Sequence, residues 1–337
     1  MVDNALNIWT TRDMNVLLTG CIGFIGAATV RKLIEAGHQV VGVDNLNHAY
    51  DPVLKEWRRH DLASLEGEGF EFLELDITDR ASIDPVVNNG QFDAVINLAA
   101  RAGVRDSVAD PWVYYETNVT GTLNLLDGCR RNGITRFVQA STSSLYGRNN
   151  TPFSENDATD QPLSPYAASK KAAEALCHSY HYLYGINTGI LRFFTVYGPA
   201  GRPDLSIFRF IRWIVEGQPV QIYGDGKQSR DFTYVEDVAR GIVSCVDSDI
   251  EYEIINLGSD RPYSILELIT EIGQLVGREP ILDFQPAAVA DVPATWADVT
   301  KASDLLGWKP ETDMRTGLLR TIDWYMANRE MAGKLVL

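Results

Sequence analysis

A tyrosine and a lysine stand four residues apart near the middle of this 337-residue chain. Tyr166 and Lys170 follow Ser164-Pro165 in an alanine-rich stretch that predicts a helix, which would place both side chains on one helical face. A tyrosine hydroxyl has a pKa of about 10 and is a poor base near neutral pH. Because a neighbouring ammonium group favours the phenolate, this spacing is typical of a tyrosine that removes a proton from a substrate.

The same spacing recurs at Tyr223 and Lys227 in a glycine-rich stretch, so the spacing alone discriminates little. The first copy differs because a hydroxyl cluster, Ser141-Thr142-Ser143, lies 23 to 25 residues before Tyr166 and directly after a predicted strand. The Thr142 hydroxyl can hydrogen-bond the substrate oxygen that Tyr166 deprotonates. An ordinary polar turn is the alternative interpretation of this cluster.

Three glycines spaced three apart, Gly20, Gly23 and Gly26, lie between an apolar run and a helical pattern. Glycines at such a turn let backbone N–H groups approach a phosphate at the positive end of the helix dipole. Asp44 follows a second apolar run, eighteen residues beyond Gly26, where an acid can bind the 2′-hydroxyl of an adenosine ribose. The pattern predicts a dinucleotide site, and Asp44 favours NAD over NADP because it repels a 2′-phosphate. A plain strand-to-helix turn is the alternative.

A particular arrangement of strands and helices is needed to bring these residues together. Apolar segments alternate with helical patterns through the first 190 residues, which predicts an α/β fold with a doubly wound parallel sheet of the Rossmann type. The expected strands are 16–19, 40–43, 70–75, 94–98, 137–140 and 188–193, and the expected helices are 26–35, 80–87, 114–131 and 165–184. Asp76, Leu98 and Ser141 each follow a strand, at the edge where such sheets bind ligands.

Glycine and proline become frequent after residue 195, which indicates a second, smaller α/β lobe. We expect residues 1–14 to be an N-terminal leader and 15–195 to form the NAD-binding domain. The lobe that binds the substrate is expected to comprise 196–229 and 259–337, while 230–258 return to the first domain.

Composition excludes several classes of function. A net charge of −15 argues against a nucleic-acid partner, because phosphate backbones require a basic face. No apolar stretch approaches the roughly 20 residues that cross a bilayer, and the first residues lack the apolar core of a signal peptide. The four cysteines are scattered, with no metal-binding spacing. We therefore expect a cytoplasmic protein with reduced thiols, no metal and no membrane partner.

These motifs together resemble the extended short-chain dehydrogenases/reductases, and within them the nucleotide-sugar 4-epimerases. The resemblance covers nearly the whole chain after residue 14. It is carried by the three glycines, Asp44-Asn45, Asp76, Asn97-Leu98-Ala99-Ala100, Asn118, the hydroxyl cluster and the Tyr166/Lys170 pair. The segments that resemble UDP-glucuronate 4-epimerases in particular are Ala102-Gly103-Val104-Arg105, residues 192–199, Gly201-Arg202-Pro203-Asp204 and residues 226–234.

The resemblance implies a tightly held NAD that oxidises and then reduces the same sugar. Tyr166 would take the proton of the 4-hydroxyl while carbon 4 gives a hydride to NAD⁺. The flat 4-keto sugar would turn over, and the return of hydride and proton would leave carbon 4 inverted.

Three groups of site residues follow from the same resemblance. The implied catalytic residues are Tyr166, Lys170 and Thr142. The implied cofactor-binding residues are Gly20, Gly23, Phe24, Ile25, Gly26, Asp44, Asn45, Asn47, Asp76, Ile77, Leu98, Ala99, Ala100, Asn118, Ala140, Tyr166, Lys170, Phe194 and Val196. The implied substrate-binding residues are Val104, Arg105, Thr142, Ser143, Ser144, Thr195, Arg202, Gln221, Tyr223, Arg230 and Asp291. Among these, Arg230 is expected at the diphosphate and Tyr223 against the uracil ring.

Arg202 separates the candidate substrates. Its guanidinium can pair bidentately with the C6 carboxylate of a glucuronate and so disfavour loss of CO₂ from the 4-keto acid. A UDP-glucose/UDP-galactose 4-epimerase, which needs no such clamp, is the main alternative. A 4,6-dehydratase or a decarboxylase is disfavoured, because Ser143-Ser144 stand where those enzymes carry a carboxylate. A non-catalytic NAD-binding regulator is the remaining alternative.

The chain also departs from the family pattern. Arg101 replaces a usual glutamine, and the segment 286–291 lacks the glycine that usually precedes Asp291. The family counterparts of 111–131 and 165–184 pair across a two-fold axis as a four-helix bundle. The resemblance therefore implies a homodimer; a buried intramolecular role for these helices is the alternative.

Overall fold

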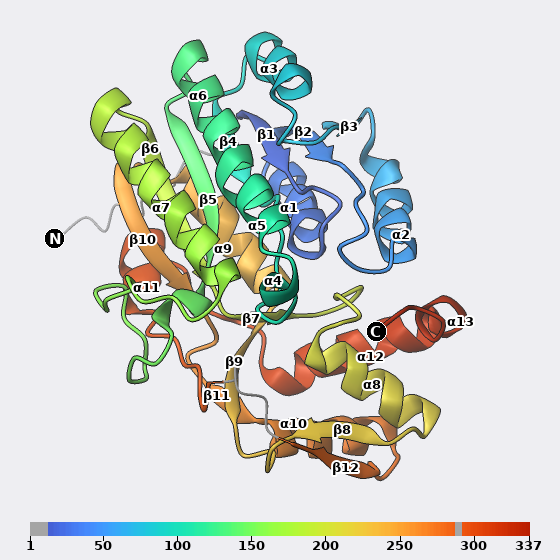
Figure 1. The fold of residues 1–337 in the computed structure, drawn as a ribbon. Coiled ribbons are helices and arrows are strands. Elements are labelled where there is room, and N and C mark those ends of the chain that lie inside the picture. Colours follow the sequence, from blue (N-terminus) through green and yellow to red (C-terminus); the bar gives the residue numbers. More distant parts are fainter. Residues whose placement is uncertain (1–12, 287–291) are drawn as a thin grey trace, which may run out of the picture.

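A seven-stranded parallel sheet forms the centre of the protein (Figure 1). The computed structural model describes residues 13–286 and 292–337. In spatial order, the strands are β10 (Tyr252–Leu257), β6 (Asn187–Phe193), β5 (Arg136–Thr142), β4 (Ala94–Asn97), β1 (Asn15–Thr19), β2 (Gln39–Asp44) and β3 (Phe70–Glu74). β1, β4 and β5 are almost wholly buried, as expected for parallel strands that are covered on both faces.

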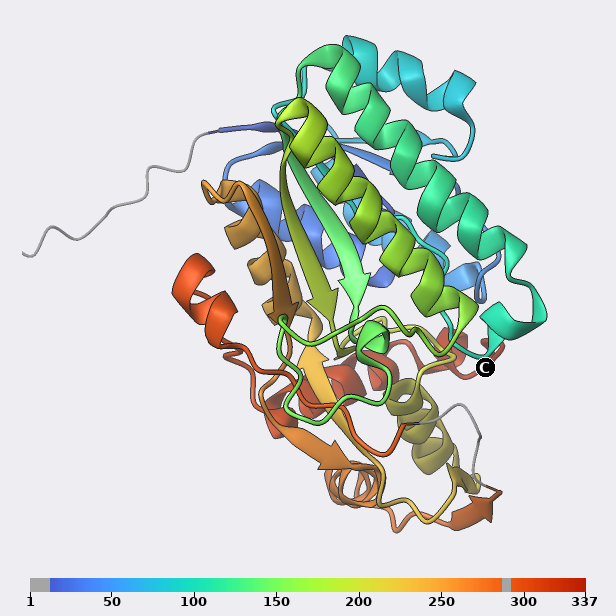
Figure 2. The same cartoon turned by 60° about the vertical axis from the view of Figure 1, so that its left-hand side comes forward.

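Helices cover both faces of this sheet. On one face α1 (Phe24–Glu35) packs against α9 (Val235–Asp247). On the other, α6 (Thr122–Asn132) contacts both α3 (Arg80–Asn89) and α7 (Pro165–Tyr184), and Figures 1 and 2 show α6 and α7 side by side. The predicted fold class, a doubly wound parallel α/β sheet, is confirmed.

Strand order reverses between β1 and β4. The chain runs outward through β2 and β3 on one side of β1, and continues through β4, β5 and β6 on the other. Neighbouring crossovers therefore diverge at this point, which opens a crevice outside the carboxyl ends of the strands. The expected ligand-binding edge of the sheet lies here.

The expected strands occur within a few residues of their predicted bounds, but the helices differ in two ways. The helix expected at 114–131 is instead α5 (Trp112–Tyr115), a π-helical turn (Glu116–Gly121) and α6. A π turn admits an extra residue without a local sequence signal, and such turns are frequent at functional sites. The helix α2 (Val53–Leu62) was not expected from the sequence.

Apart from α9 and β10, which belong to the layers of the large sheet, the strands beyond residue 194 build smaller sheets below its carboxyl ends (Figures 1 and 2). One contains β7 (Thr195–Tyr197), β9 (Ser229–Tyr234) and β11 (Pro262–Ser264), and the other pairs β8 (Val220–Tyr223) with β12 (Leu282–Gln285). The helices α8 (Ser206–Glu216), α10 (Ile265–Val276) and α12 (Met314–Ala327) pack on one another beside them. The buried positions 207, 208, 211, 214 and 215 of α8 recur at helical spacing, which gives it one apolar face.

The remaining helices are short. They are α4 (Asp106–Ala109), α11 (Thr300–Leu306), α13 (Arg329–Ala332) and the 3-10 turns Ala63–Leu65 and Ser143–Tyr146. None of the described helices has the length and apolar character that a membrane-spanning helix requires.

Candidate active site

A cavity of about 440 Å³ lies at the carboxyl edge of the large sheet. It is lined by the ends of several strands, by the start of α7 and by the loop that carries Arg202. The predicted site residues that line it are Gly20, Gly23, Phe24, Ile25, Gly26, Asp44, Asn45, Asn47, Asp76, Ile77, Leu98, Ala99, Ala100, Val104, Ala140, Thr142, Ser143, Ser144, Tyr166, Lys170, Phe194, Thr195, Val196 and Arg202. Residues from distant parts of the sequence therefore meet in one space.

The glycine turn exposes backbone because no side chain fits there. A Cβ on Gly26 would lie 2.0 Å from the carbonyl oxygen of Gly20, and one on Gly23 would lie 2.9 Å from the same atom. Gly20 also has a φ of +72°, a conformation that glycine adopts most readily. α1 begins directly after this turn, with no side-chain cap and no acidic residue in its first turn. A bare, positively polarised helix end fits a pyrophosphate, as binding of a dinucleotide requires.

Asp44 is held rigidly at the end of β2. Its carboxylate accepts the backbone N–H of Ile22 at 3.2 Å and that of Leu46 at 2.9 Å. Lys55 of α2 places its Nζ 3.6 Å from Asp44 Oδ1. Burial lowers the pKa of Lys55, and Asp44 opposes that shift. Lys55 lines the same cavity but was missed from the sequence, because no spacing rule links it to Asp44.

Asn45 and Asp76 join the ends of β2 and β3. Asn45 Nδ2 donates to Asp76 Oδ2 at 2.7 Å, and the backbone N–H and hydroxyl of Thr78 both donate to Oδ1 at 2.8 Å. Burial raises the pKa of Asp76, but these hydrogen bonds outweigh it, so the net shift is downward. The carboxylate is therefore an ionised acceptor at the cavity wall.

The catalytic candidates lie where α7 meets the end of β5. Ser164 caps α7 by accepting the N–H of Ala167, and Pro165 occupies the first turn. Lys170 is 4% exposed, and its Nζ donates to the carbonyl of Ala140 on β5 at 3.0 Å. The Thr142 side chain lies beside the Tyr166 phenol and lowers its pKa. The helix start and the strand end thus bring the phenol, a hydroxyl and an amine together.

Burial dominates the ionisation of this group. It raises the pKa of Tyr166, and the Thr142 side chain and the charge of Arg202 lower it in part. Burial also lowers the pKa of Lys170 to about 8, against the opposing charge of Glu174. We expected the neighbouring ammonium group of Lys170 to favour the phenolate; in the protein itself the opposing contributions come from Thr142 and Arg202. A cationic ligand ring beside Tyr166 would add to them.

Glu174 is a buried carboxylate that sequence reasoning missed. It accepts the Ser141 hydroxyl at 2.7 Å and two hydrogen bonds from Arg192, each at 2.9 Å. Its position four residues after Lys170, on the same face of α7, was the available signal. This carboxylate ties α7 to the ends of β5 and β6 next to the catalytic residues.

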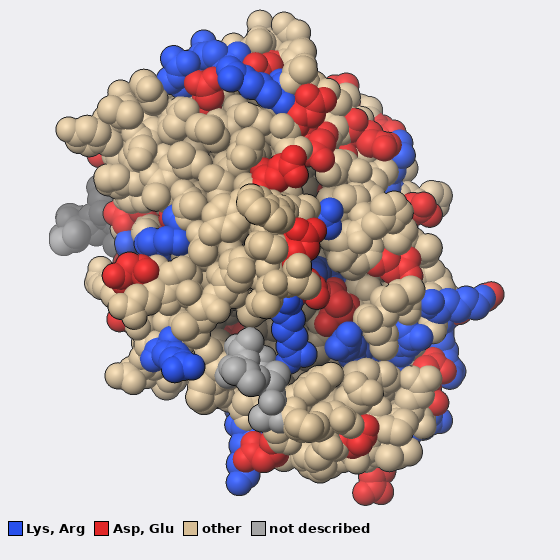
Figure 3. Space-filling view, viewed as in Figure 1, with Lys and Arg blue, Asp and Glu red and all other residues tan. Residues whose placement is uncertain are grey.

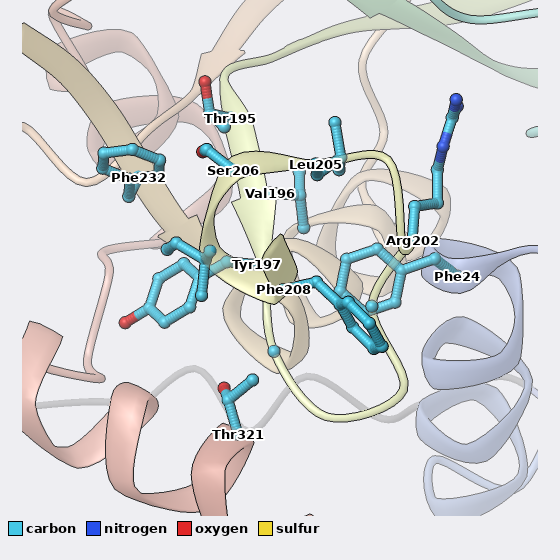
Figure 4. A pocket seen from close by; sticks show the side chains of 13 residues that line it. Phe24, Thr195, Val196, Tyr197, Arg202, Leu205, Ser206, Phe208, Phe232 and Thr321 are labelled. Carbon is cyan, nitrogen blue, oxygen red and sulfur yellow. The ribbon is translucent and has the colours of Figure 1, made fainter. Parts of the chain in front are cut away.

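Arg202 projects from the loop after β7. Figure 4 shows its side chain extending away from Phe208, on the rim of a second, small cavity of about 10 Å³. Its guanidinium pairs with Asp204 at 2.7 Å and stacks over the Tyr50 ring at 5.3 Å. The hydroxyl residues predicted with it, Thr142, Ser143, Ser144 and Thr195, line the same large cavity.

A buried arginine braces this loop against the glycine turn. Arg58 of α2 is 1% exposed; its Nη1 donates to the Ile22 carbonyl at 3.2 Å and to the Tyr50 hydroxyl at 2.7 Å. Its Nη2 donates to the Ala200 carbonyl at 2.7 Å. Arg58 was also missed, because its partners lie 36 and 142 residues away.

Several predicted residues do not line this cavity. Asn118 sits in the π turn, where its amide binds the backbone of Arg101 and donates to the Ser169 hydroxyl at 2.9 Å. Asn118 therefore holds backbone that lies behind the cavity lining and does not line the cavity itself. The other predicted site residues that do not line the cavity are Arg105, Gln221, Tyr223 and Arg230. Asp291 lies outside the described residues.

Arg105 and Tyr223 contact one another across the gap between the large sheet and the smaller one. The guanidinium carbon of Arg105 lies 4.8 Å from the centre of the Tyr223 ring. Arg230 lies on β9, opposite Tyr263 of β11. Tyr223 and Arg230 therefore lie on the smaller sheets and not in the lining of the cavity.

Comparison with known proteins identifies the chain's relatives. A model of the NAD dependent epimerase/dehydratase family matches residues 16–258. A UDP-glucuronate 4-epimerase of Thermodesulfobacterium geofontis is 48% identical over 316 residues, which cover 94% of this chain and 97% of the relative.

Solved structures agree with this assignment. A crystal structure of UDP-glucuronic acid 4-epimerase from Bacillus cereus, in complex with UDP-glucuronic acid and NAD, matches with a TM-score of 0.86 at 36% identity, over 93% of this chain and 99% of that one. UDP-glucose 4-epimerase from Thermotoga maritima with UDP-glucose matches with a TM-score of 0.84 at 30% identity, over 94% and 100%. The resemblance stated from the motifs is thereby confirmed. This chain belongs to the NAD dependent epimerase/dehydratase family.

Proposed function

We propose that this chain is an isomerase that interconverts UDP-glucuronate and UDP-galacturonate by inverting carbon 4 of the sugar. The observation that carries this proposal is the meeting of Tyr166, Thr142 and Arg202 in one cavity with the glycine turn of a dinucleotide site. The similarity to UDP-glucuronate 4-epimerases over almost the whole chain supports it.

The glycine turn, the start of α1 and Asp44 fit an NAD molecule, with the pyrophosphate at the helix end and a ribose hydroxyl on the carboxylate. When bound, NAD supplies the acceptor and donor of the hydride at carbon 4. Tyr166 takes the proton of the 4-hydroxyl and later returns a proton to the same oxygen. Thr142 orients that oxygen and, together with Arg202, favours the phenolate of Tyr166, while Lys170 lies one helical turn away at the wall of the same cavity.

Arg202 and the neighbouring hydroxyl groups hold the sugar's carboxylate. A charge-assisted hydrogen bond to a guanidinium fixes the carboxylate in space. A fixed carboxylate cannot easily turn its C–C bond parallel to the π system of the 4-ketone, so loss of CO₂ is disfavoured. This assignment explains why the site of a uronate epimerase needs a cation opposite carbon 6.

Neutral hexoses are the competing substrates, since the chain also matches a UDP-glucose 4-epimerase. Purified protein should be incubated with NAD and either UDP-glucuronate or UDP-glucose, and the epimers separated by chromatography. We expect turnover of the uronate and at least about tenfold lower kcat/KM for the neutral sugar, a difference of about 1.4 kcal/mol. Arg202→Ala should abolish uronate turnover selectively. Equal turnover of both sugars would contradict the substrate assignment.

For the nucleotide we assign Arg230 to the diphosphate, Tyr223 to the uracil face and Gln221 to the same end of the ligand. These residues lie on the smaller sheets, in β8 and β9. The Arg105–Tyr223 contact supports this assignment, because it brings together two residues that the family resemblance implies for substrate binding.

We also propose a homodimer formed through α6 and α7. Large apolar side chains are exposed on this side of the molecule: Trp112 is 82% exposed, Tyr182 80% and Leu183 61%. Figure 3 shows mostly uncharged side chains over the lower part of α6 and over α7, with charged side chains gathered at the upper end of α6. Paired helices from two copies would bury this surface as a four-helix bundle. Since all four cysteines are buried and unpaired, we further expect the protein in the cytoplasm.

A further inference from the structure

The guanidinium group of Arg202 is already engaged by residues of its own chain. Its Nε and Nη2 donate to Oδ1 and Oδ2 of Asp204 at 3.1 and 2.7 Å. Nη2 also donates to the carbonyl of Ala102 at 3.3 Å. A guanidinium carries one hydrogen on Nε and two on each Nη. These contacts use the hydrogens of Nε and Nη2, which leaves the pair on Nη1 for another acceptor.

The position of the guanidinium is fixed from several directions. Asp204 holds one edge, Ala102 shares Nη2, and the Tyr50 ring covers a face at 5.3 Å. The side chains of Arg202 and Asp204 are only 15% and 30% exposed, and both line the large cavity. Arg202 is therefore a directed donor rather than a mobile cation at the surface.

We propose that Asp204 is a positioning residue that determines specificity for a sugar carboxylate. It holds Arg202 by the Nε/Nη2 edge and presents Nη1 to the C6 carboxylate. The second oxygen of the sugar carboxylate then accepts a hydrogen bond from the hydroxyl of Thr142, Ser143 or Thr195. This inference rests on the proposed function, and it replaces the bidentate Arg202–substrate pair that we expected from the sequence.

The charges of Arg202 and Asp204 explain why this pair distinguishes a sugar carboxylate from other anions. An unpaired arginine in a partly dry cavity attracts any anion, including phosphate. Pairing with Asp204 neutralises most of that attraction and leaves one directional donor, so recognition depends on where the carboxylate lies. If Asp204 instead competed with the substrate for Arg202, removing it would strengthen binding of the uronate. The two roles therefore predict changes of opposite sign.

The test compares Asp204→Ala and Asp204→Asn with wild type. For Asp204→Ala we expect KM and Kd for UDP-glucuronate to rise about tenfold with kcat within about twofold, while Kd for UDP-glucose stays unchanged. Asp204→Asn keeps an oxygen that accepts from Arg202, so its loss should be about threefold. Asp61→Ala is the matched control, because Asp61 pairs with Arg31 outside the cavity. Thermal unfolding of each variant verifies that it is folded.

A double-mutant cycle shows whether Asp204 acts through Arg202. The double variant Arg202→Ala/Asp204→Ala should bind UDP-glucuronate no more weakly than Arg202→Ala alone. A lower KM in Asp204→Ala, additive losses in the double variant, or an equal loss for UDP-glucose would each overturn the inference. A wild-type protein that binds UDP-glucuronate without epimerising it would refute the proposed function instead. In that case the Kd values of wild type and the Asp204 variants would still test the role of Asp204.

Discussion

Glu174 and Arg192 form a buried bidentate ion pair next to the proposed catalytic residues. The two hydrogen bonds both measure 2.9 Å, and the side chains are 2% and 1% exposed. Glu174 also accepts the hydroxyl of Ser141 and partly offsets the effect of burial on the pKa of Lys170. One carboxylate thus joins α7, β5 and β6 and supports the ammonium form of Lys170, the proposed catalytic lysine.

Glu174→Gln should destabilise the protein strongly. The substitution leaves the buried guanidinium of Arg192 without a counter-charge, a change that typically costs about 3–5 kcal/mol. Urea unfolding followed by circular dichroism measures the loss. Glu236→Gln is the control, because Glu236 pairs with Arg320 at an exposed position and should change stability by less than about 1 kcal/mol. Equal effects of the two substitutions would show that the buried pair is not a major source of stability.

Lys170→Met should change how stability depends on pH. Burial lowers the pKa of Lys170 from 10.5 to about 8. Between these values the unfolded chain binds more protons at this residue than the folded one, so its contribution to stability increases as pH rises from about 8 to 10.5. The full change is about 3 kcal/mol, from 1.36 kcal/mol per pKa unit.

The measurement is the free energy of unfolding of wild type and Lys170→Met at several pH values across that range. Met cannot ionise, so the stability advantage of the variant over wild type should shrink as pH rises. Lys309→Met, at an exposed position, serves as the control, and its difference from wild type should stay constant. A constant difference for Lys170→Met would contradict the lowered pKa.

Tyr166→Phe should remove catalysis and retain binding. Loss of a proton-transferring group typically lowers kcat by about 10²–10⁴-fold, while the phenyl ring keeps the shape of the site. Chromatographic assay of epimerisation gives kcat, and calorimetry gives Kd for UDP-glucuronate. Tyr182→Phe, on the exposed side of the same helix, should keep wild-type turnover. Residual kcat above a tenth of wild type would exclude Tyr166 as the base.

Asp44→Asn should weaken discrimination between NAD and NADP. The carboxylate repels a 2′-phosphate, and the amide does not, while Lys55 beside it offers a cation at 3.6 Å from the present carboxylate. We expect Kd for NADP to fall at least about tenfold, measured by quenching of tryptophan fluorescence. Adding Lys55→Met to the variant should cancel the gain. An unchanged Kd for NADP would show that other residues exclude the phosphate.

The sequence predicted those features whose determinants are local. The glycine turn and Asp44 belong to one β-α-β unit, in which the strand end and the helix start fix the position of every residue. Tyr166 and Lys170 are one turn apart on one helix, so their proximity also follows from spacing alone. Alternating apolar runs likewise predicted the first six strands within a few residues, whereas α2 and the π turn that divides the helix expected at 114–131 left no such signal.

Tertiary structure alone decided how these units face each other. Arg58 connects the glycine turn to Ala200, which lies 142 residues from Arg58 in the sequence. Glu174 of α7 pairs with Arg192, which belongs to a strand of the large sheet. The edge of Arg202 that remains for a ligand depends on Asp204, Ala102 and Tyr50 together. A hydrogen bond across such distances in sequence leaves no periodicity, because periodicity records only which face of an element is buried. The glycine turn and the Tyr166/Lys170 pair could therefore be predicted from the sequence, whereas the direction of each donor required the folded chain.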